Sequence, residues 1–313
     1  MPKYSIIIPV FNRPDEIDEL LASLMKQSFD DFEVILVEDG SSKTCQAIAE
    51  HYANQLNVRY FFKENEGQGY ARNYGYQRAE GEVLIVFDSD CLIPPNYFQE
   101  VNDYLGLHQV DAFGGPDTAL DSFTPIQRAI SHTMTSFFTT GGIRGRKKQI
   151  GTYHPRSFNM GITQKVFQKT GGYRIPFMGE DLEFSIRIIT AGFKTALIPN
   201  AFVYHKRRTN LIQFYKQINY FGRARINLTR FHSGHLKIVH LFPLIFVLGF
   251  LSAFILSFLD QKLGFLGIGC YLIYLLLIFL EALLKSKSLK VALYAPLTTL
   301  IQMLGYAVGL IHE

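Results

Sequence analysis

The amino-acid sequence predicts an α/β fold, with a mostly parallel sheet between flanking helices, followed by C-terminal transmembrane helices. Strand and helix patterns alternate at short spacing over the first 90 residues, and three long apolar runs fill the last quarter of the chain. The chain has 313 residues, of which 48% are hydrophobic and 19% charged, so it can bury a large core. A disordered or collagen-like polymer is excluded.

Four apolar strands are predicted in the first 90 residues, each followed by a loop of polar or small residues. They cover residues 5–8, 34–37, 58–62 and 83–87. Between them we expect one helix opened by Pro14, one that carries Ile48 and Tyr52, and one from about residue 70 to 79. Because ligands of open α/β sheets bind beyond the carboxyl ends of the strands, the four loops are expected to meet in one crevice.

The middle of the chain is less regular. The elements predicted there are a strand at 110–113, helices at 126–138, from about 163 to 171 and at 181–191, and a strand at 195–198. The Gly-rich and basic stretch 140–148 is expected to form a mobile loop. The sequence shows no internal repeat or low-complexity tract.

Three apolar runs near the end of the chain predict membrane spans. They cover residues 241–259, 263–284 and 291–311 and contain 19, 22 and 21 residues. A helix needs about 20 apolar residues to cross a bilayer, so each run is long enough. Their single acid, Glu281, falls in the last turn of the second run. Buried core helices are the alternative, but these would carry a polar face that the runs lack.

Charge is distributed unevenly along the chain. Residues 1–205 carry 19 basic and 24 acidic side chains, whereas residues 206–237 carry eight basic and no acidic ones. The block 206–240 is therefore predicted to be a basic amphipathic segment on anionic lipid. Its aromatic residues would also suit nucleic acid, but its place directly before a membrane span favours lipid, and no nucleic-acid partner is expected.

The loops between the apolar runs predict an orientation. Loop 260–262 is nearly neutral and loop 285–290 is basic, and basic loops stay in the cytoplasm. Residues 1–240 are therefore expected on the cytoplasmic side of the inner membrane and the last run is expected to end outside. No signal peptide is expected, because the apolar stretch 4–10 is short and contains Pro9. Three widely spaced cysteines are expected to be free thiols: Cys45, Cys91 and Cys270.

Asp88 and Asp90 directly follow the fourth predicted strand. Two residues apart on an extended segment, their side chains are expected to project to the same side. Two carboxylates so placed repel each other unless a cation joins them. Hard oxygen ligands suit Mg²⁺ or Mn²⁺, which in such sites also bind substrate phosphates. We therefore expect a divalent-cation site here, with a solvated turn as the alternative.

Five segments in order and register resemble family 2 glycosyltransferases of the GT-A fold, which is Rossmann-like. They are SIIIPVFN at 5–12, VEDGSS at 37–42, NEGQGYARN at 65–73, DSD at 88–90 and GED at 179–181. The resemblance covers residues 4 to about 205. It implies a GT-A domain over residues 1–205, with a nucleotide-sugar half at about 1–113 and an acceptor half at about 114–205.

The resemblance implies a role for each matching residue of the donor half. Asp39 would read the nucleotide base, Arg72 would contact the base or the diphosphate, and Asp88 would contact the ribose or base. Asp90 would bind the metal. The implied donor-binding set is Pro9, Phe11, Asn12, Glu38, Asp39, Asn65, Gly67, Arg72, Asp88 and Ser89. The family more often has Asp at the position of Glu38, which bears on nucleotide preference.

On the acceptor side, the resemblance implies that Asp181 is the catalytic base. Glu180, Gly114 and Gly115 are placed on the same side, and His205 is a further metal or diphosphate contact. A carboxylate can remove the proton of a hydroxyl as its oxygen attacks the anomeric carbon, while a metal offsets charge on the leaving diphosphate. Two alternatives stay open: the acids at 180–181 also favour a helix N-terminus, and His205 also suits an ordinary interface.

These expectations together predict an inverting, metal-dependent glycosyltransferase of the hexosyltransferase type. It would move one sugar from a nucleotide sugar, most simply a UDP-sugar, to a hydroxyl of a membrane lipid or lipid-linked glycan in cell-envelope polysaccharide synthesis. Processive synthases of the family carry a Gln-x-x-Arg-Trp motif, and this chain has no Trp. The alternatives are a polyprenyl-phosphate sugar synthase, whose acceptor needs no base, a non-catalytic membrane scaffold with a nucleotide-binding domain, and nucleotidyl transfer.

Overall fold

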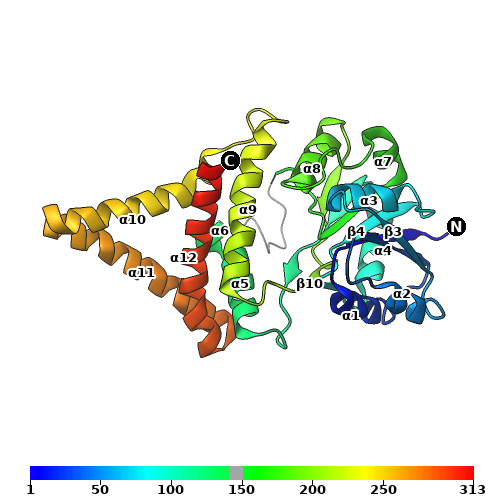
Figure 1. The fold of residues 1–313 in the computed structure, drawn as a ribbon, viewed down its shortest axis with the longest axis horizontal. Coiled ribbons are helices and arrows are strands. Elements are labelled where there is room, and N and C mark those ends of the chain that lie inside the picture. The colour runs from blue at the N-terminus through cyan, green and yellow to red at the C-terminus, as the bar shows by residue number, and fades with distance from the viewer. Residues whose placement is uncertain (141–150) are drawn as a thin grey trace. The chain divides into compact units, whose positions relative to one another are not determined.

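The computed structural model describes residues 1–140 and 151–313, which divide into two compact units (Figure 1). The sheet unit comprises Met1–Thr118 and residues 151–206. The helical unit comprises residues 119–140 and Arg207–Glu313. Residues 119–140, which the sequence places in the acceptor half of one domain, therefore pack with the C-terminal helices. Residues 141–148 of the expected mobile loop lie outside the described residues.

The sheet unit is built on a seven-stranded sheet of order β3-β2-β1-β4-β8-β6-β9. Its strands are β1 (Tyr4–Val10), β2 (Phe32–Asp39), β3 (Val58–Lys63), β4 (Val83–Phe87), β6 (Ala112–Gly114), β8 (Asn159–Thr163) and β9 (Thr195–Leu197). Strands β3, β2, β1 and β4 are parallel, β8 is antiparallel to both β4 and β6, and β6 is parallel to β9. The predicted mostly parallel α/β fold is confirmed, and β8 is a strand that the sequence pattern did not predict.

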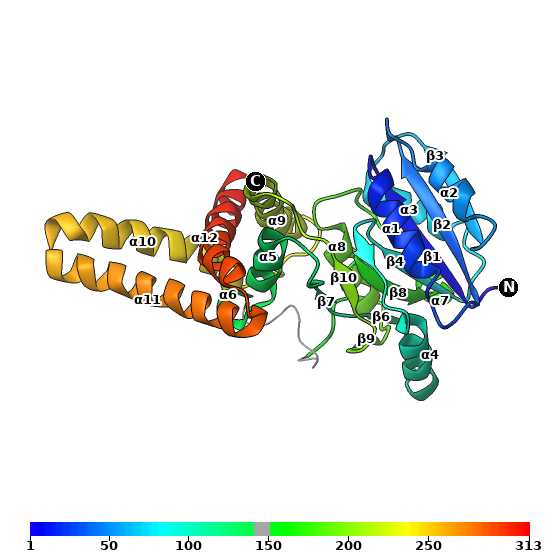
Figure 2. The same cartoon turned by 90° about the horizontal axis from the view of Figure 1, so that it is seen from below.

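Helices cover both faces of this sheet (Figures 1 and 2). They are α1 (Pro14–Leu24), α2 (Gln46–Tyr52), α3 (Gln68–Tyr76), α4 (Tyr97–Leu107), α7 (Gln164–Thr170) and α8 (Glu180–Thr190). Alternation along β1 separates the two cores: Ile6 packs with α1, α2 and α4, whereas Ile7 packs with α3, α7 and α8. Every residue of β4 is buried, as a strand covered on both faces requires.

A second, three-stranded sheet of order β5-β10-β7 lies in the same unit. Its strands are β5 (Cys91–Leu92), β7 (Asp117–Thr118) and β10 (Val203–His205). Strand β10 pairs antiparallel with β5, with His205 opposite Cys91. The sequence did not predict these short strands, yet their pairing brings the end of the sheet unit back to the segment that follows β4.

The helical unit contains six α-helices in its described part. They are α5 (Pro125–Thr135), α6 (Phe137–Thr140), α9 (Leu211–Thr229), α10 (Phe242–Leu259), α11 (Gln261–Ser286) and α12 (Leu289–His312). The single helix expected at 126–138 is thus divided into α5 and α6. The last three helices are long and apolar enough to cross a membrane, where α10 is counted together with the short helical turn before it. In Figure 1, α10 and α11 form a hairpin, and α12 lies beside α9.

Candidate active site

The loops at the carboxyl ends of β1 and β2 are held together by Asn12. Its backbone has a φ of 54°, in the left-handed region that Asn tolerates better than most residues. The Asn12 side-chain oxygen accepts hydrogen bonds from the backbone N–H of Ser42 at 2.9 Å and of Lys43 at 3.0 Å. In return, the Asn12 backbone N–H donates to the Ser41 hydroxyl at 2.7 Å. The predicted donor loops therefore form one hydrogen-bonded rim.

Asp39 ends β2 and is 4% exposed. Its carboxylate contacts the Lys63 ammonium at 2.8 Å and accepts hydrogen bonds from the backbone N–H of Glu66 at 3.1 Å and of Gly67 at 2.9 Å. Gly67 has a φ of 99°, and a Cβ there would lie 2.8 Å from Pro176, so only glycine suits the turn into α3. Asp39 thus shapes the loop at the predicted base-binding position, and its contact with a base stays a prediction.

Glu38 precedes Asp39 on β2 and is fully buried. One carboxylate oxygen accepts a hydrogen bond from the Ser41 hydroxyl, and the other accepts from the backbone N–H of Cys45 at 2.8 Å and from the Tyr60 hydroxyl at 3.3 Å. These bonds hold the loop between β2 and α2. The expected contact of Glu38 with the donor stays a prediction. Its support in the structure is indirect: Glu38 positions the loop between β2 and α2.

We expect Glu38→Asp to lower the thermal unfolding midpoint while leaving the KM for the donor nearly unchanged. The shorter side chain cannot reach all three of its donors, and leaving a buried polar group unsatisfied costs about 1–3 kcal/mol. Thermal unfolding of the full chain in detergent, together with donor titrations, measures both quantities. Glu64→Asp, at an exposed position, is the matched control. A raised donor KM with an unchanged midpoint would instead show that Glu38 contacts the donor.

Arg72, on α3, links Asp88, directly after β4, to the start of α8. The side chain is 1% exposed and donates to Asp88 at 2.9 Å and to Glu180 at 3.0 Å. Burial opposes its charge, but Tyr173, Asp88 and Glu180 together raise the pKa of Arg72, so it stays a cation. Its Nε is buried and has no hydrogen-bond acceptor within the described residues. This network places a fixed positive charge beside the predicted ribose contact.

Glu180 and Asp181 begin α8 after a sharply turned segment. Met178 and Gly179 have φ values of 68° and 96°, and a non-glycine residue in that region marks local strain. Glu180 is 4% exposed and also accepts a hydrogen bond from Gln68. Burial raises the pKa of the Glu180 carboxyl, and Arg72 opposes that rise. Glu180 is therefore hydrogen-bonded to Gln68 and Arg72 on the donor side, and Asp181 follows it in the same turn of α8.

Asp181 is more exposed than Glu180, with a side chain that is 18% accessible. One of its carboxylate oxygens lies 3.0 Å from Nε of Arg156, and the other accepts the backbone N–H of Leu182 at 2.8 Å. The first turn of α8 also carries Glu180 and Glu183, as the positive end of a helix dipole favours. Asp181 is thus an oriented carboxylate that an acceptor could approach, next to a cation that the sequence had not indicated.

Asp90 and His205 lie together, with a carboxylate oxygen 3.0 Å from Nε2 of the imidazole. The other oxygen of Asp90 contacts the Arg13 guanidinium at 2.7 Å. Cys91 completes a group whose candidate ligand atoms all lie within 4.8 Å of one another. Nδ1 of His205 lies 4.0 Å from a carboxylate oxygen of Asp117. These residues are a possible divalent-cation group, in which the Asp90 carboxylate supplies the oxygen that Mn²⁺ or Mg²⁺ prefers and the Asp117 carboxylate lies behind the imidazole.

The remaining predicted residues have less direct places. Pro9 lies in β1, Phe11 is half-exposed after it, Ser89 is buried between the two aspartates, and the Asn65 amide donates to the Asp39 carbonyl at 2.8 Å. Gly114 and Gly115 are points of close packing. A Cβ on Gly115 would lie 1.7 Å from the carbonyl oxygen of Ala201. Their acceptor-side role stays a prediction.

The structure connects the predicted donor and acceptor residues through short contacts. A path runs from Asp39 through the Gly67 backbone and Gln68 to Glu180, and on through Arg72 to Asp88. Sequence reasoning missed Arg13, Gln68 and Arg156. Arg13 directly follows the first motif and Gln68 lies within the third, so their positions were a usable signal, whereas nothing near Arg156 in the sequence marks it.

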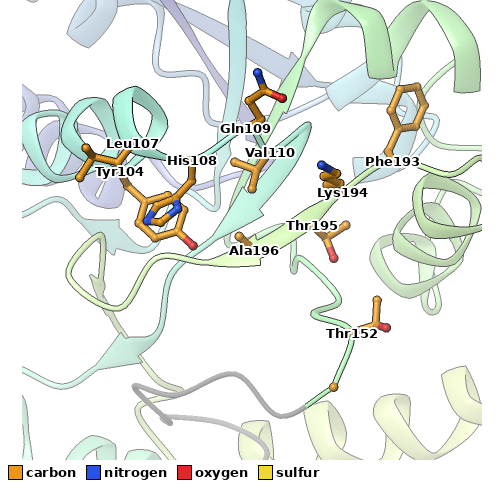
Figure 3. A pocket seen from close by; sticks show the side chains of 11 residues that line it. Tyr104, Leu107, His108, Gln109, Val110, Thr152, Phe193, Lys194, Thr195 and Ala196 are labelled. Carbon is orange, nitrogen blue, oxygen red and sulfur yellow. The ribbon is translucent and has the colours of Figure 1, made fainter.

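A separate pocket of about 700 Å³ lies at the β9 edge of the main sheet (Figure 3). The rings of Tyr104 and His108 pack against each other at one side of it, and Lys194 and Thr195 lie at the start of β9. None of the predicted site residues lines this pocket. Thr152 also lines this pocket.

The fold and the acid-rich edge of the sheet define a GT-A-type glycosyltransferase. The sequence model of glycosyl transferase family 2 matches residues 5–171, which is more than half of the chain. The chain therefore belongs to glycosyl transferase family 2, and the predicted family and enzyme class are confirmed.

Relatives of known name match about a third of the chain. The poly(ribitol-phosphate) β-N-acetylglucosaminyltransferase TarS of Staphylococcus aureus is 36% identical over 115 residues, which are 36% of this chain and 20% of that protein. The validoxylamine A glucosyltransferase of Streptomyces hygroscopicus subsp. jinggangensis is 34% identical over 105 residues, 32% of this chain and 25% of that protein. The matched part thus spans a quarter or less of each relative.

Two solved structures share the fold over 99% of this chain. The mannosyltransferase PcManGT from Pyrobaculum calidifontis, in complex with GDP-Man and Mn²⁺, has a TM-score of 0.60 at 15% identity, with 87% of that chain covered. Residues 1–349 of S. aureus TarS, in complex with UDP-GlcNAc, have a TM-score of 0.53 at 18% identity, with 90% of that chain covered. At these identities the likeness concerns the fold alone.

Proposed function

We propose that this chain is an inverting, metal-dependent glycosyltransferase that moves one sugar from a nucleotide sugar to a hydroxyl of a membrane-associated acceptor. The observation that carries the proposal is the connected set Asp39, Arg72, Asp88 and Glu180, with Asp181 one residue further along α8. It joins a predicted donor edge to a carboxylate that can act as a base. The expected setting is cell-envelope glycan synthesis.

Nucleoside diphosphates are the class of ligand that the residues of the predicted donor site are suited to bind. Asp39 and Asp88 are acceptors that can bind a base edge and ribose hydroxyls, and Arg72 adds a cation that does not titrate. Similar folds bind UDP-GlcNAc and GDP-Man in the two structures described above. We favour a UDP-sugar donor. The absence of Trp, and hence of the processive motif, supports transfer of one sugar at a time.

Asp90 and His205 are the residues that would hold a divalent cation. Such a cation would offset the negative charge that builds on the leaving diphosphate. Arg13, which contacts Asp90 at 2.7 Å, adds a permanent positive charge at the same place. Asp181 would take the proton from the acceptor hydroxyl, since a positioned carboxylate is a competent general base. One displacement of this kind inverts the anomeric carbon.

We further propose that the helical unit anchors the enzyme in the inner membrane, with the sheet unit in the cytoplasm. The hairpin of α10 and α11 is almost entirely exposed and apolar: in the most apolar window of each helical segment, only 6% and 11% of residues are buried. Basic residues lie at its open end: Lys237 before α10, Lys285 in the last turn of α11, and Lys287 and Lys290 shortly after it. Cations of this kind stay on the cytoplasmic side.

A phosphate acceptor is the second candidate, and Arg156 is the observation that favours it. Its guanidinium lies 3.0 Å from Asp181, where it could bind an acceptor phosphate in the manner arginine favours. An ionised phosphate needs no base. In a polyprenyl-phosphate sugar synthase, therefore, Arg156 would matter more for turnover than Asp181.

The deciding experiment is an assay of the full chain in detergent with a panel of UDP- and GDP-sugars, membrane lipid extract and Mn²⁺. We expect nucleoside diphosphate release, a product one sugar heavier than its acceptor, and loss of turnover with EDTA. Asp90→Asn should raise the Mn²⁺ concentration needed for half-maximal rate, whereas Asp103→Asn on α4 should not. Release of inorganic diphosphate would indicate nucleotidyl transfer, and normal cellular function of Asp90→Ala would indicate a scaffold.

A further inference from the structure

We infer that the bilayer contacts the helical unit along two surfaces: α10 and α11 cross it as a hairpin, while α12 lies along its surface. Residue 313 then lies on the same side of the membrane as the sheet unit. Hydropathy alone predicts a third span at 291–311 that ends outside. The contacts of α12 within the helical unit point to the different path.

The first observation is that α12 is covered along its length by helices that cannot span. Its first half packs on α5, where the Thr133 hydroxyl lies 2.7 Å from that of Thr298 and both side chains are fully buried. Its second half packs on α9, so closely that a Cβ on Gly309 would lie 2.2 Å from the carbonyl oxygen of Asn219. Half of the residues in the most apolar window of α12 are buried, and its mean hydropathy is 1.4, against 2.5 for each hairpin segment.

The second observation is the pattern of exposure on α12. Its exposed large apolar residues are Leu289, Leu293, Leu297, Leu300, Leu304 and Ile311. Steps of four, four, three, four and seven residues place them on one stripe of the helix. A helix with a single apolar stripe and a packed, partly polar opposite face is typical of one that lies in the membrane interface. Figure 1 shows α12 crossing the open end of the hairpin beside α9, as this arrangement requires.

The third observation fixes the side on which α12 ends. Glu313 forms ion pairs with Arg223 at 2.9 Å and Arg230 at 2.7 Å. Arg223 belongs to α9, and Arg230 directly follows it. Because α9 begins shortly after β10 and no spanning helix lies between them, its arginines are on the side of the sheet unit. A spanning α12 would have to carry Glu313 across the membrane, or draw the charged helix α9 into the lipid.

Charges at the open end of the hairpin agree with this path. Glu281, near the end of α11, pairs with Lys285 at 2.6 Å and also accepts a hydrogen bond from Ser136, which lies between α5 and α6. These polar partners place this end of α11 at the membrane surface. The opposite end, where α10 turns into α11 at Asp260, is the part of the hairpin that would emerge on the far side.

The test is thiol accessibility of the full chain in intact and permeabilised spheroplasts, with a membrane-impermeant maleimide. The background is Cys270→Ser, since Cys45 and Cys91 are buried. Three exposed positions each receive one thiol: Gln261→Cys at the hairpin turn, His312→Cys at the end of α12 and Glu50→Cys on α2 as the control for the sheet unit. We expect Gln261→Cys to react equally in both preparations, and His312→Cys and Glu50→Cys to react only after permeabilisation.

Reaction of all three thiols in detergent establishes that each is accessible in the folded chain. Reaction of His312→Cys together with Gln261→Cys in intact spheroplasts would overturn the inference, because α12 would then span. Protection of Gln261→Cys together with the other two would also overturn it, because the hairpin would not cross. If Glu50→Cys and His312→Cys react from outside and Gln261→Cys does not, the inferred path stands and the proposed cytoplasmic orientation is wrong.

Discussion

Asp181→Asn is expected to lower kcat by about 1,000-fold while leaving nucleotide affinity almost unchanged, because a positioned general base contributes about 10²–10⁴ in rate. In free energy of activation this loss is about 4 kcal/mol. The amide keeps the shape of the side chain and a hydrogen-bonding oxygen, but it cannot take the acceptor proton. Asp181 also lies outside the Arg72 network, so the donor edge should stay intact.

The measurement is the steady-state rate of sugar transfer, with nucleoside diphosphate affinity determined separately by titration. Asp103→Asn is the matched control, because it removes an exposed carboxylate on α4 and should leave kcat unchanged. A nearly normal kcat for Asp181→Asn, together with a strong loss for Arg156→Met, would contradict the hydroxyl acceptor and favour a phosphate. Arg156→Met should otherwise act more weakly, since Arg156 then only orients Asp181.

The parts of the fold that the sequence predicts are those set by local patterns. Strands β1 to β4 are mostly apolar, and their helices carry apolar faces at helical spacing. Strand β8 escapes prediction because Gly161 interrupts it and its pairing is long-range. A Cβ on Gly161 would lie 2.1 Å from the ring of Phe113, so the glycine is present for packing against β6 rather than as a turn signal.

In the candidate site, too, local patterns predict some positions, whereas long-range pairing sets others. Motif order correctly indicates that Asp39 and Asp88 lie at the carboxyl ends of β2 and β4. The period of two along a strand could have separated Glu38 from Asp39, since neighbours on a strand face opposite sides. The contact between His205 and Asp90 depends on the pairing of β10 with β5, two strands too short for any periodicity to mark.

Arg72→Met is expected to destabilise the sheet unit by about 3–5 kcal/mol, because it leaves the buried Glu180 without its counter-charge. In a unit of this size we expect the thermal unfolding midpoint to fall by roughly 10 °C. Arg72→Lys should recover only part of the loss. A lysine is a point charge that cannot donate in the fixed fork that reaches both Asp88 and Glu180.

Thermal unfolding of the full chain in detergent measures the effect, and Arg174→Met, at an exposed arginine, is the matched control. The double variant Arg72→Met with Glu180→Gln removes both charges and should recover much of the midpoint, since two buried partners lost together leave no uncompensated ion. Its activity should stay low, because Asp88 loses the cation that holds it at 2.9 Å. Equal midpoints for Arg72→Met and Arg174→Met would mean that the Arg72–Glu180 pair does not stabilise the link between α3 and α8.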